Sequence, residues 1–367
     1  MARAFDSFQQ RSCQEPQPPS NFRMLVITIA GFFSAFAYIN PTQALVQNPF
    51  ASLREERNDG IHLAVHPQCG PLGGNTTDVN AGISLRSIKT IVSFGDSYTD
   101  GGKHDGSPLD PPVLIPPGIE AGGRSTDGPV WIEYIADDIN ARFMDYAISS
   151  AVVNISLWPD NPFPRDFLQQ MAIFLNQSND LDPKTTLYTV FFGINDWEDS
   201  MIDGDHLPEA AQDLLNQIQI LASEPTNGRN FLVTDVYGRG THTASGEAWK
   251  QSIFDGLTAF HRGTNVPEPL NVAFGDFSRI WDGVLGSDPG YQAFGYTSTD
   301  SCVVGDTTAG SCSDPKHYFY WISGQVILSQ FGDRKVLTMP LHRHPSNETM
   351  RIMADYVEEV LDKCRID

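Results

Sequence analysis

Three polar residues stand where they could cleave an ester together. Ser97 follows an apolar run at 88–94, Asn195 follows another at 186–192, and His344 lies near the C-terminus. A serine hydroxyl becomes a good nucleophile when a neutral imidazole takes its proton. Donors aimed at the negative oxygen that forms on the carbonyl then stabilise the transition state. The chemistry expected of this set is attack on an acyl group.

The elements that must position these residues alternate along the chain. Apolar, β-rich runs at 88–94, 143–148, 186–192, 230–235 and 271–277 are separated or followed by helical patterns at 129–140, 165–177, 207–222, 245–261 and 347–361. Strands that alternate with helices predict a parallel sheet covered on both faces. We therefore expect one three-layer α/β/α domain, residues 45–367, with a five-stranded parallel sheet of flavodoxin-like order. Ser97 and Asn195 would lie at the carboxyl edge, where ligands bind in such sheets.

Composition limits the partners. The 367 residues carry 45 acidic and 24 basic side chains, a formal net charge of −21. This charge disfavours nucleic acid and anionic membrane surfaces as partners. No C-x-x-C motif or histidine cluster points to a metal, so we expect no cofactor, and a monomer.

The N-terminus has the pattern of a secretory signal. The apolar run from Met24 to Ile39 is shorter than a membrane span of about 20 residues. Arg23 precedes it, and the small residues Thr42 and Ala44 permit cleavage after Ala44. We assign 1–44 to a signal region, with Met24 as a possible true start and a single-pass anchor as the alternative. A secreted, extracellular protein without stable membrane association is expected after cleavage.

Glycosylation and disulfides fit that compartment. Four Asn-x-Ser/Thr sequons begin at Asn75, Asn154, Asn176 and Asn347. Loss of 1–44 removes Cys13 and leaves Cys69, Cys302, Cys312 and Cys364, an even number that predicts two disulfides. Of three possible pairings, we favour a local Cys302–Cys312 bridge and a Cys69–Cys364 bridge that ties the domain ends.

Three ordered blocks resemble those of the GDSL, or SGNH, hydrolases. They are Gly-Asp-Ser at 95–97, Gly-Ile-Asn-Asp at 193–196 and His-Pro-Ser at 344–346. The segment 123–131 also resembles fungal members, and the chain is most similar to fungal secreted carbohydrate acetyl esterases from about Cys69 onward. The resemblance implies an α/β carboxylic ester hydrolase that removes acetyl groups from plant-cell-wall oligosaccharides through an acyl-enzyme.

The resemblance also implies roles for individual residues. Ser97 would be the nucleophile and His344 the general base. The oxyanion hole would combine the backbone N–H of Ser97, a backbone N–H in the segment 145–151 and the side chain of Asn195. Most of the family has glycine in that segment, and this chain has serines. We assign the donor to Ser150 and leave Ser149 open.

The last block departs further from the family, which has an Asp three residues before the His. Here Leu341 holds that place. Removal of 325–343 would restore the expected spacing, with Ile322 in the Asp position. We therefore expect an insertion at 325–343, either a translated retained intron or a genuine surface loop. The site would then be a Ser-His dyad, with Asp314 and Asp333 as possible substitute acids.

Two rival functions remain. A lipase or long-chain esterase would need an apolar acyl groove. A catalytically impaired sugar-binding glycoprotein would fit the missing acid and the insertion. Trp131, Trp158 and Trp197 lie near predicted loops and are candidates for stacking on sugar rings.

Overall fold

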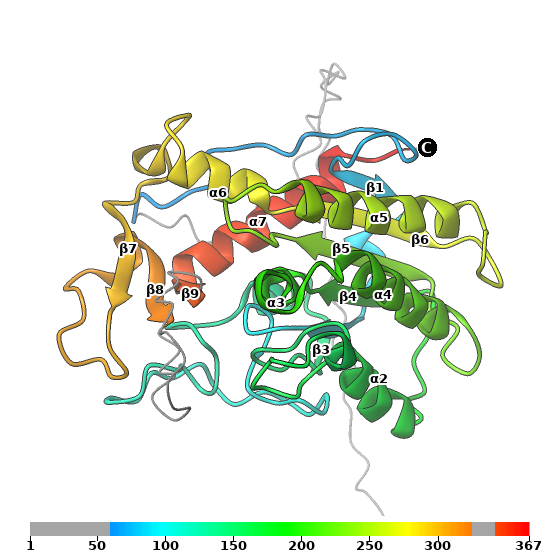
Figure 1. The fold of residues 1–367 in the computed structure, drawn as a ribbon, viewed down its shortest axis with the longest axis horizontal. Coiled ribbons are helices and arrows are strands. Elements are labelled where there is room, and N and C mark those ends of the chain that lie inside the picture. The colour runs from blue at the N-terminus through cyan, green and yellow to red at the C-terminus, as the bar shows by residue number, and fades with distance from the viewer. Residues whose placement is uncertain (1–58, 325–341, 367) are drawn as a thin grey trace, which may run out of the picture. The chain divides into compact units, whose positions relative to one another are not determined.

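A computed structural model describes residues 59–324 and 342–366 of the chain (Figure 1). The predicted signal region and residues 325–341 of the predicted insertion lie outside these ranges. Within them, no helix is both long and apolar enough to cross a membrane.

The central sheet has six strands in the order β1-β6-β5-β4-β2-β3. Their bounds are β1 Val79–Ala81, β2 Thr90–Gly95, β3 Arg142–Asp145, β4 Thr186–Phe191, β5 Asn230–Asp235 and β6 Asn271–Asp276. The last five, β2 to β6, are mutually parallel. If they are numbered 1 to 5 along the chain, their order across the sheet is 2-1-3-4-5, which is the flavodoxin-like order. The predicted parallel sheet is confirmed. The antiparallel edge strand β1 was not predicted, since it has only three residues.

The strands are apolar on both faces because helices cover both. Every residue of β4 is buried. Tyr188 and Val190 pack into one core, and Leu187 and Phe191 pack into the other. Parallel strands buried on two faces have this near-continuous apolar sequence.

Seven α-helices are described, and six of them form the outer layers (Figure 1). One layer shares its core with α2 Phe167–Asn176, α4 Leu207–Ala222 and α5 Ala244–His261. The other contains α1 Trp131–Asp138, α6 Ser278–Leu285 and α7 Asn347–Lys363. The seventh, α3, spans Ile194–Asp203, and single 3₁₀ turns occur at Leu85–Ser87, Ile155–Leu157, Tyr291–Phe294 and Pro315–His317. The five predicted helices are confirmed, whereas α3 and α6 were missed.

A second, three-stranded sheet was not predicted. It comprises β7 Ser298–Val303, β8 Tyr318–Gly324 and β9 His342–Pro345, with β8 at its centre. Strands β8 and β9 pair antiparallel, so the chain on either side of the segment 325–341 is brought together. The last two residues of the predicted insertion, His342 and Arg343, belong to β9.

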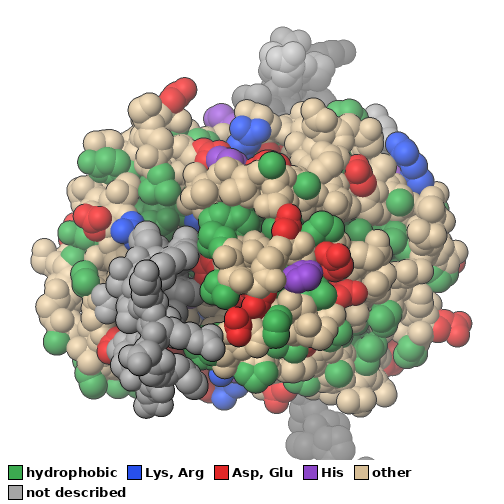
Figure 2. Space-filling model, viewed as in Figure 1, with side chains coloured by type: hydrophobic (Ala, Val, Ile, Leu, Met, Phe, Trp, Pro, Cys, Tyr) green, Lys and Arg blue, Asp and Glu red, His purple; other side chains and the backbone are tan. Residues whose placement is uncertain are grey.

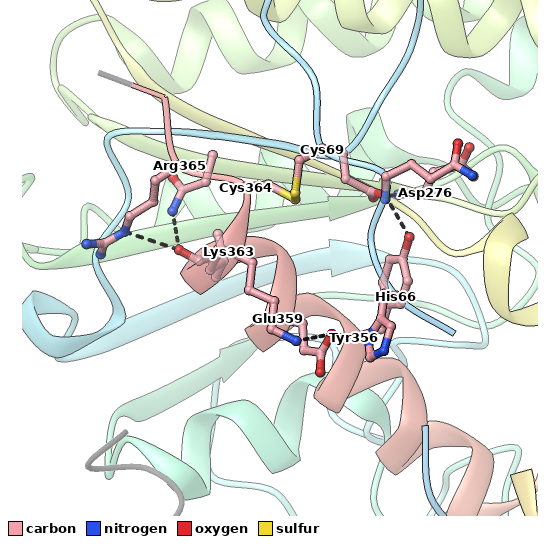
Figure 3. Close-up of a disulfide and its surroundings, with 12 residues drawn as sticks. His66, Cys69, Asp276, Tyr356, Glu359, Lys363, Cys364 and Arg365 are labelled. Atoms are coloured by element: carbon pink, nitrogen blue, oxygen red, sulfur yellow. Dashed lines mark hydrogen bonds and ion pairs between the residues drawn. A yellow bond between two sulfur atoms is a disulfide. The ribbon is translucent and has the colours of Figure 1, made fainter. Parts of the chain in front are cut away.

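Both favoured disulfides are present. Cys302 and Cys312 close the loop between β7 and β8, and Cys69 is joined to Cys364 at the end of α7 (Figure 3). The second bridge is reinforced beside α7, where the hydroxyl of Tyr356 donates to the buried carboxylate of Asp78 at 2.7 Å. The N-terminal part of the domain is thus fixed to its C-terminal helix.

Candidate active site

Ser97 lies on a tight turn directly after β2. The backbone carbonyl of Asp96 accepts hydrogen bonds from the N–H groups of Thr99 and Asp100, each at 3.0 Å. The carboxylate of Asp96 accepts from the N–H of Tyr98, also at 3.0 Å. The turn therefore presents the Ser97 side chain at the carboxyl edge of the sheet, where it was predicted to lie.

His344 reaches Ser97 from the second sheet. Its Nε2 lies 2.8 Å from the Ser97 Oγ, and His344 is opposite Ile322 in the pairing of β8 with β9. The hydroxyl of Tyr98 donates to the backbone carbonyl of Arg343 at 2.5 Å. Because Tyr98 adjoins the serine and Arg343 adjoins the histidine, this bond ties the two halves of the site together.

The loop after β3 distinguishes the two candidate serines. The N–H and the hydroxyl of Ser149 both donate to the carboxylate of Asp100, at 2.7 Å each. Ser150 has φ of +67°, a left-handed conformation that favours glycine. Among the described residues, the N–H groups of Ser150 and Ser97 have no hydrogen-bond acceptor. The N–H of Ser150 is therefore the one able to face a ligand.

Asn195 is the second residue of α3, whose N-cap is the left-handed Gly193 just after β4. Its side-chain amide donates to the backbone carbonyl of Ala151 at 2.9 Å. An amide nitrogen carries two N–H donors, so this bond fixes the orientation of the group and leaves the second donor available. Because Ala151 directly follows Ser150 in the chain, this bond holds the Asn195 side chain close to Ser150.

The position of the family's acid is apolar on the described part of the chain. Ile322 lies across the strand pair from His344, and only 7% of its surface is exposed. Asp314 instead contacts the Nδ1 of His317 at 2.7 Å, so it does not serve as the substitute acid proposed from the sequence. Leu341 and Asp333 lie outside the described residues.

Two buried carboxyl groups, those of Asp96 and Asp196, lie beside the site residues in the sequence. Burial raises the pKa of Asp96 to about 8 and that of Asp196 to about 6. Asp196 accepts from the N–H of Val153 at 3.0 Å and from the indole N–H of Trp158 at 3.1 Å. Asp196 therefore orders the loop that follows Ser150 and Ala151.

The predicted sugar-stacking tryptophans are wrong, because all three are core residues. Trp131 and Trp158 have no exposed surface, and Trp197 has 4%. The three indole N–H groups donate to Thr99, Asp196 and Thr243, respectively. These tryptophans therefore pack in the core beneath the loops and are not available to stack on sugar rings.

Ser97 and His344 open into a cavity of about 320 Å³. Its lining is mostly polar: Ser97, Glu120, Ser125, Ser149, Ser150, Arg165, Asp306, Ser323 and His344, with Ile119, Val304, Gly305 and Ile322. Asn195 is not part of this lining. Within residues 59–324 and 342–366, no group of three or more His, Cys, Asp or Glu side chains is placed to hold a metal ion.

Sequence reasoning missed two residues that hold the site in place. Gln170 of α2 accepts from the N–H of Gly95 at 3.0 Å and donates to its carbonyl at 2.8 Å, directly before the serine turn. Tyr98 is buried at 1% exposure and does not line the cavity. In the sequence, only the position of Tyr98 next to Ser97 pointed to a role for it. Gln170, a single glutamine within a helical pattern, carried no such signal.

Comparison with known proteins identifies the family of this chain. The family model described as GDSL-like Lipase/Acylhydrolase matches residues 91–357, so the chain belongs to this family. The resemblance predicted from the sequence is confirmed, and at the level of the family so is the class of carboxylic ester hydrolases.

Individual relatives are more distant. An acetylesterase from Hypocrea jecorina is 26% identical over 168 residues, which cover 40% of this chain and 47% of that protein. The match therefore spans about half the length of this relative. A lipolytic G-D-S-L family protein from Veillonella parvula is 15% identical, covers 75% of this chain and 100% of its own, and gives a TM-score of 0.37. A variant acetyl xylan esterase from Geobacillus stearothermophilus is 16% identical, covers 54% and 82%, and gives 0.31.

Proposed function

We propose that this protein is a secreted serine esterase that hydrolyses small acyl esters, above all acetyl esters on plant-cell-wall oligosaccharides. The observation that carries the proposal is the 2.8 Å contact between Ser97 Oγ and His344 Nε2 within a polar cavity. A nucleophile and a base at hydrogen-bond distance are the minimum that acyl transfer to serine needs.

The proposed reaction has two halves. His344 Nε2 accepts the proton of Ser97 as its Oγ attacks the ester carbonyl, and the resulting oxyanion is held by the N–H groups of Ser97 and Ser150 and by the amide of Asn195. His344 then gives the proton to the leaving alcohol, which leaves an acyl-serine. Water repeats the same sequence in reverse and releases the acid.

The cavity supports a polar alcohol rather than a long hydrocarbon. Most of its lining side chains can form hydrogen bonds to hydroxyl groups. Acidic side chains are also more prominent than basic ones on the face shown in Figure 2, in line with the net charge of −21. An acetylesterase among the relatives agrees with a small acyl group.

Secretion remains part of the proposal. The two disulfides suit an oxidising compartment, and the sequons at Asn75 and Asn176 are exposed. The other two are engaged in contacts: Asn154 donates to Asp213 at 2.7 Å, and Asn347 accepts from the hydroxyl of Tyr134. We expect glycans at Asn75 and Asn176 first.

Hydrolysis of p-nitrophenyl esters of increasing acyl length tests the proposal. We expect the highest kcat/KM with acetate and a steep fall by octanoate. Ser97→Ala should lower kcat by on the order of 10⁴-fold or more with an unchanged melting temperature. A preference for long chains would favour the lipase alternative. Retained activity in Ser97→Ala would remove Ser97 as the nucleophile, and an inactive wild type would favour the sugar-binding alternative.

A further inference from the structure

A second cavity adjoins the candidate active site. It measures about 450 Å³ and lies between the segment 113–123 and Asp306, which is in the loop between β7 and β8. Ile119, Glu120 and Asp306 line both cavities, so the two are neighbours that share a wall. Their volumes, about 320 and 450 Å³, exceed what an acetyl group alone requires.

The walls of this second cavity are built by specific contacts. Arg124, which has no exposed surface, forms two hydrogen bonds to Glu133, at 2.6 and 2.7 Å. Its Nη1 donates to the carbonyls of Ala121 and Gly122, and its Nη2 also donates to that of Asp110, which fixes the course of the segment. The segment is therefore held in shape from beneath by a buried, paired guanidinium.

The two walls are also joined to each other and to the core. The N–H of Thr308 donates to the carbonyl of Pro117 at 3.1 Å. The indole of the buried Trp321 donates to the carbonyl of Ile119 at 2.7 Å. The Cys302–Cys312 disulfide closes the loop that carries Thr308 and Asp306. The cavity is thus largely formed before any ligand binds.

The chemistry of the second cavity combines exposed apolar surface with carboxylates. Val113 and Ile115 are 55% and 70% exposed. Glu120 and Asp306 are also exposed, and no basic side chain lines this cavity. Sugar rings match this combination, since their C–H faces pack on aliphatic groups while their hydroxyls donate to carboxylates. A uronate chain would be repelled by the two acids, and an alkyl chain would have to pass between them and desolvate them.

We propose that this second cavity binds the neutral sugar chain that carries the ester, with Glu120 and Asp306 accepting hydrogen bonds from its hydroxyls. The inference rests on the proposed function, because it presupposes that the alcohol part of the substrate is a carbohydrate. It predicts that the enzyme prefers acetylated oligosaccharides to acetylated monosaccharides.

Steady-state kinetics on acetylated neutral oligosaccharides of one to six sugars test this preference, with p-nitrophenyl acetate as the short reference. KM should fall as the chain lengthens. The double variant Glu120→Gln/Asp306→Ala should raise KM for the longest substrate roughly 10-fold, because each exposed charged hydrogen bond contributes only a few-fold. Its KM for p-nitrophenyl acetate should change several-fold less than its KM for the longest substrate, because the short ester has no sugar chain to occupy the second cavity. Alanine is chosen at 306 because Asn before Thr307-Thr308 would create a sequon.

The control is Glu209→Gln, an exposed carboxylate on α4 that lines neither cavity. It should change no parameter. An enzyme that cleaves p-nitrophenyl acetate but shows no dependence on sugar length would overturn this inference and leave the proposed function intact. A KM in the double variant that is unchanged, or that rises equally for p-nitrophenyl acetate, would also overturn it. The inference would also be overturned if kcat/KM rose with the length of the acyl chain and this rise were lost in Ile115→Ala. An enzyme inactive on every acetyl ester would instead contradict the proposed function.

Discussion

Replacement of Ser150 by glycine separates the backbone donor from the side chain. A non-glycine residue in the left-handed region costs roughly 1–2 kcal/mol. Replacement by glycine removes this cost, but the greater entropy of glycine in the unfolded chain lowers the free energy of unfolding by roughly 0.5–1 kcal/mol. With φ of +67° at Ser150, we expect Ser150→Gly to raise the free energy of unfolding by about 0.5–1 kcal/mol. Its kcat/KM should stay within about threefold, since the proposed donor is the backbone N–H.

Urea unfolding and p-nitrophenyl acetate hydrolysis measure the two effects. Ser178, an exposed residue with φ of +50° at the end of α2, provides a matched control. Because Ser178→Gly removes the sequon at Asn176, both variants are compared with the wild type in deglycosylated form, where Ser178→Gly should give a similar stabilisation and no change in activity. A loss of activity beyond 10-fold in a stably folded Ser150→Gly variant would refute the backbone-donor reasoning. Destabilisation in Ser150→Gly alone would refute the strain argument.

Three further predictions concern the site and its support. Asn195→Ala should lower kcat by about 10²–10³-fold, and it should lower the melting temperature because the carbonyl of Ala151 loses its donor; a change in KM alone would contradict the oxyanion role. Burial raises the pKa of Asp96 from 3.8 to about 8, so the folded state keeps a proton that the unfolded chain releases. The unfolding free energy should therefore fall as pH rises across that interval, and less so in Asp96→Asn; parallel pH profiles would count against this. Alanine replacement of both Cys69 and Cys364, which are 295 residues apart, should lower the free energy of unfolding in denaturant by about 5 kcal/mol. The same replacement of Cys302 and Cys312, which are 10 residues apart, should lower it by about 3 kcal/mol. Equal losses would argue against loop entropy as the cause.

The parallel sheet was predictable because its sequence pattern is local. Strands such as β4 are continuous apolar runs, and helices such as α4 repeat apolar residues on one face, so each element could be found within its own window. The helix α3 escaped because half of its first six residues, Ile194 to Asp199, are acidic and hide its buried side. The small sheet escaped because β8 pairs with β9 across 325–341, a relation that no local window contains.

The site was predictable where chemistry required a residue type and unpredictable where it required only a contact. Ser97 and His344 were identified by their blocks, and the structure brings them together. The choice of Ser150 over Ser149 followed from a missing glycine, and the left-handed φ agrees with it. Tyr98 could not be assigned, because its role depends on a hydrogen bond to Arg343, far away in the sequence.

Labelling of the full chain by a fluorophosphonate shows whether His344 activates Ser97 as a nucleophile. The reagent phosphonylates an activated serine and releases fluoride, so intact mass and peptide mapping report the site and the rate. We predict one adduct, on Ser97, at a rate that falls by about 10³-fold or more in His344→Ala. No adduct, an adduct on another serine, or an equal rate in His344→Ala would contradict it.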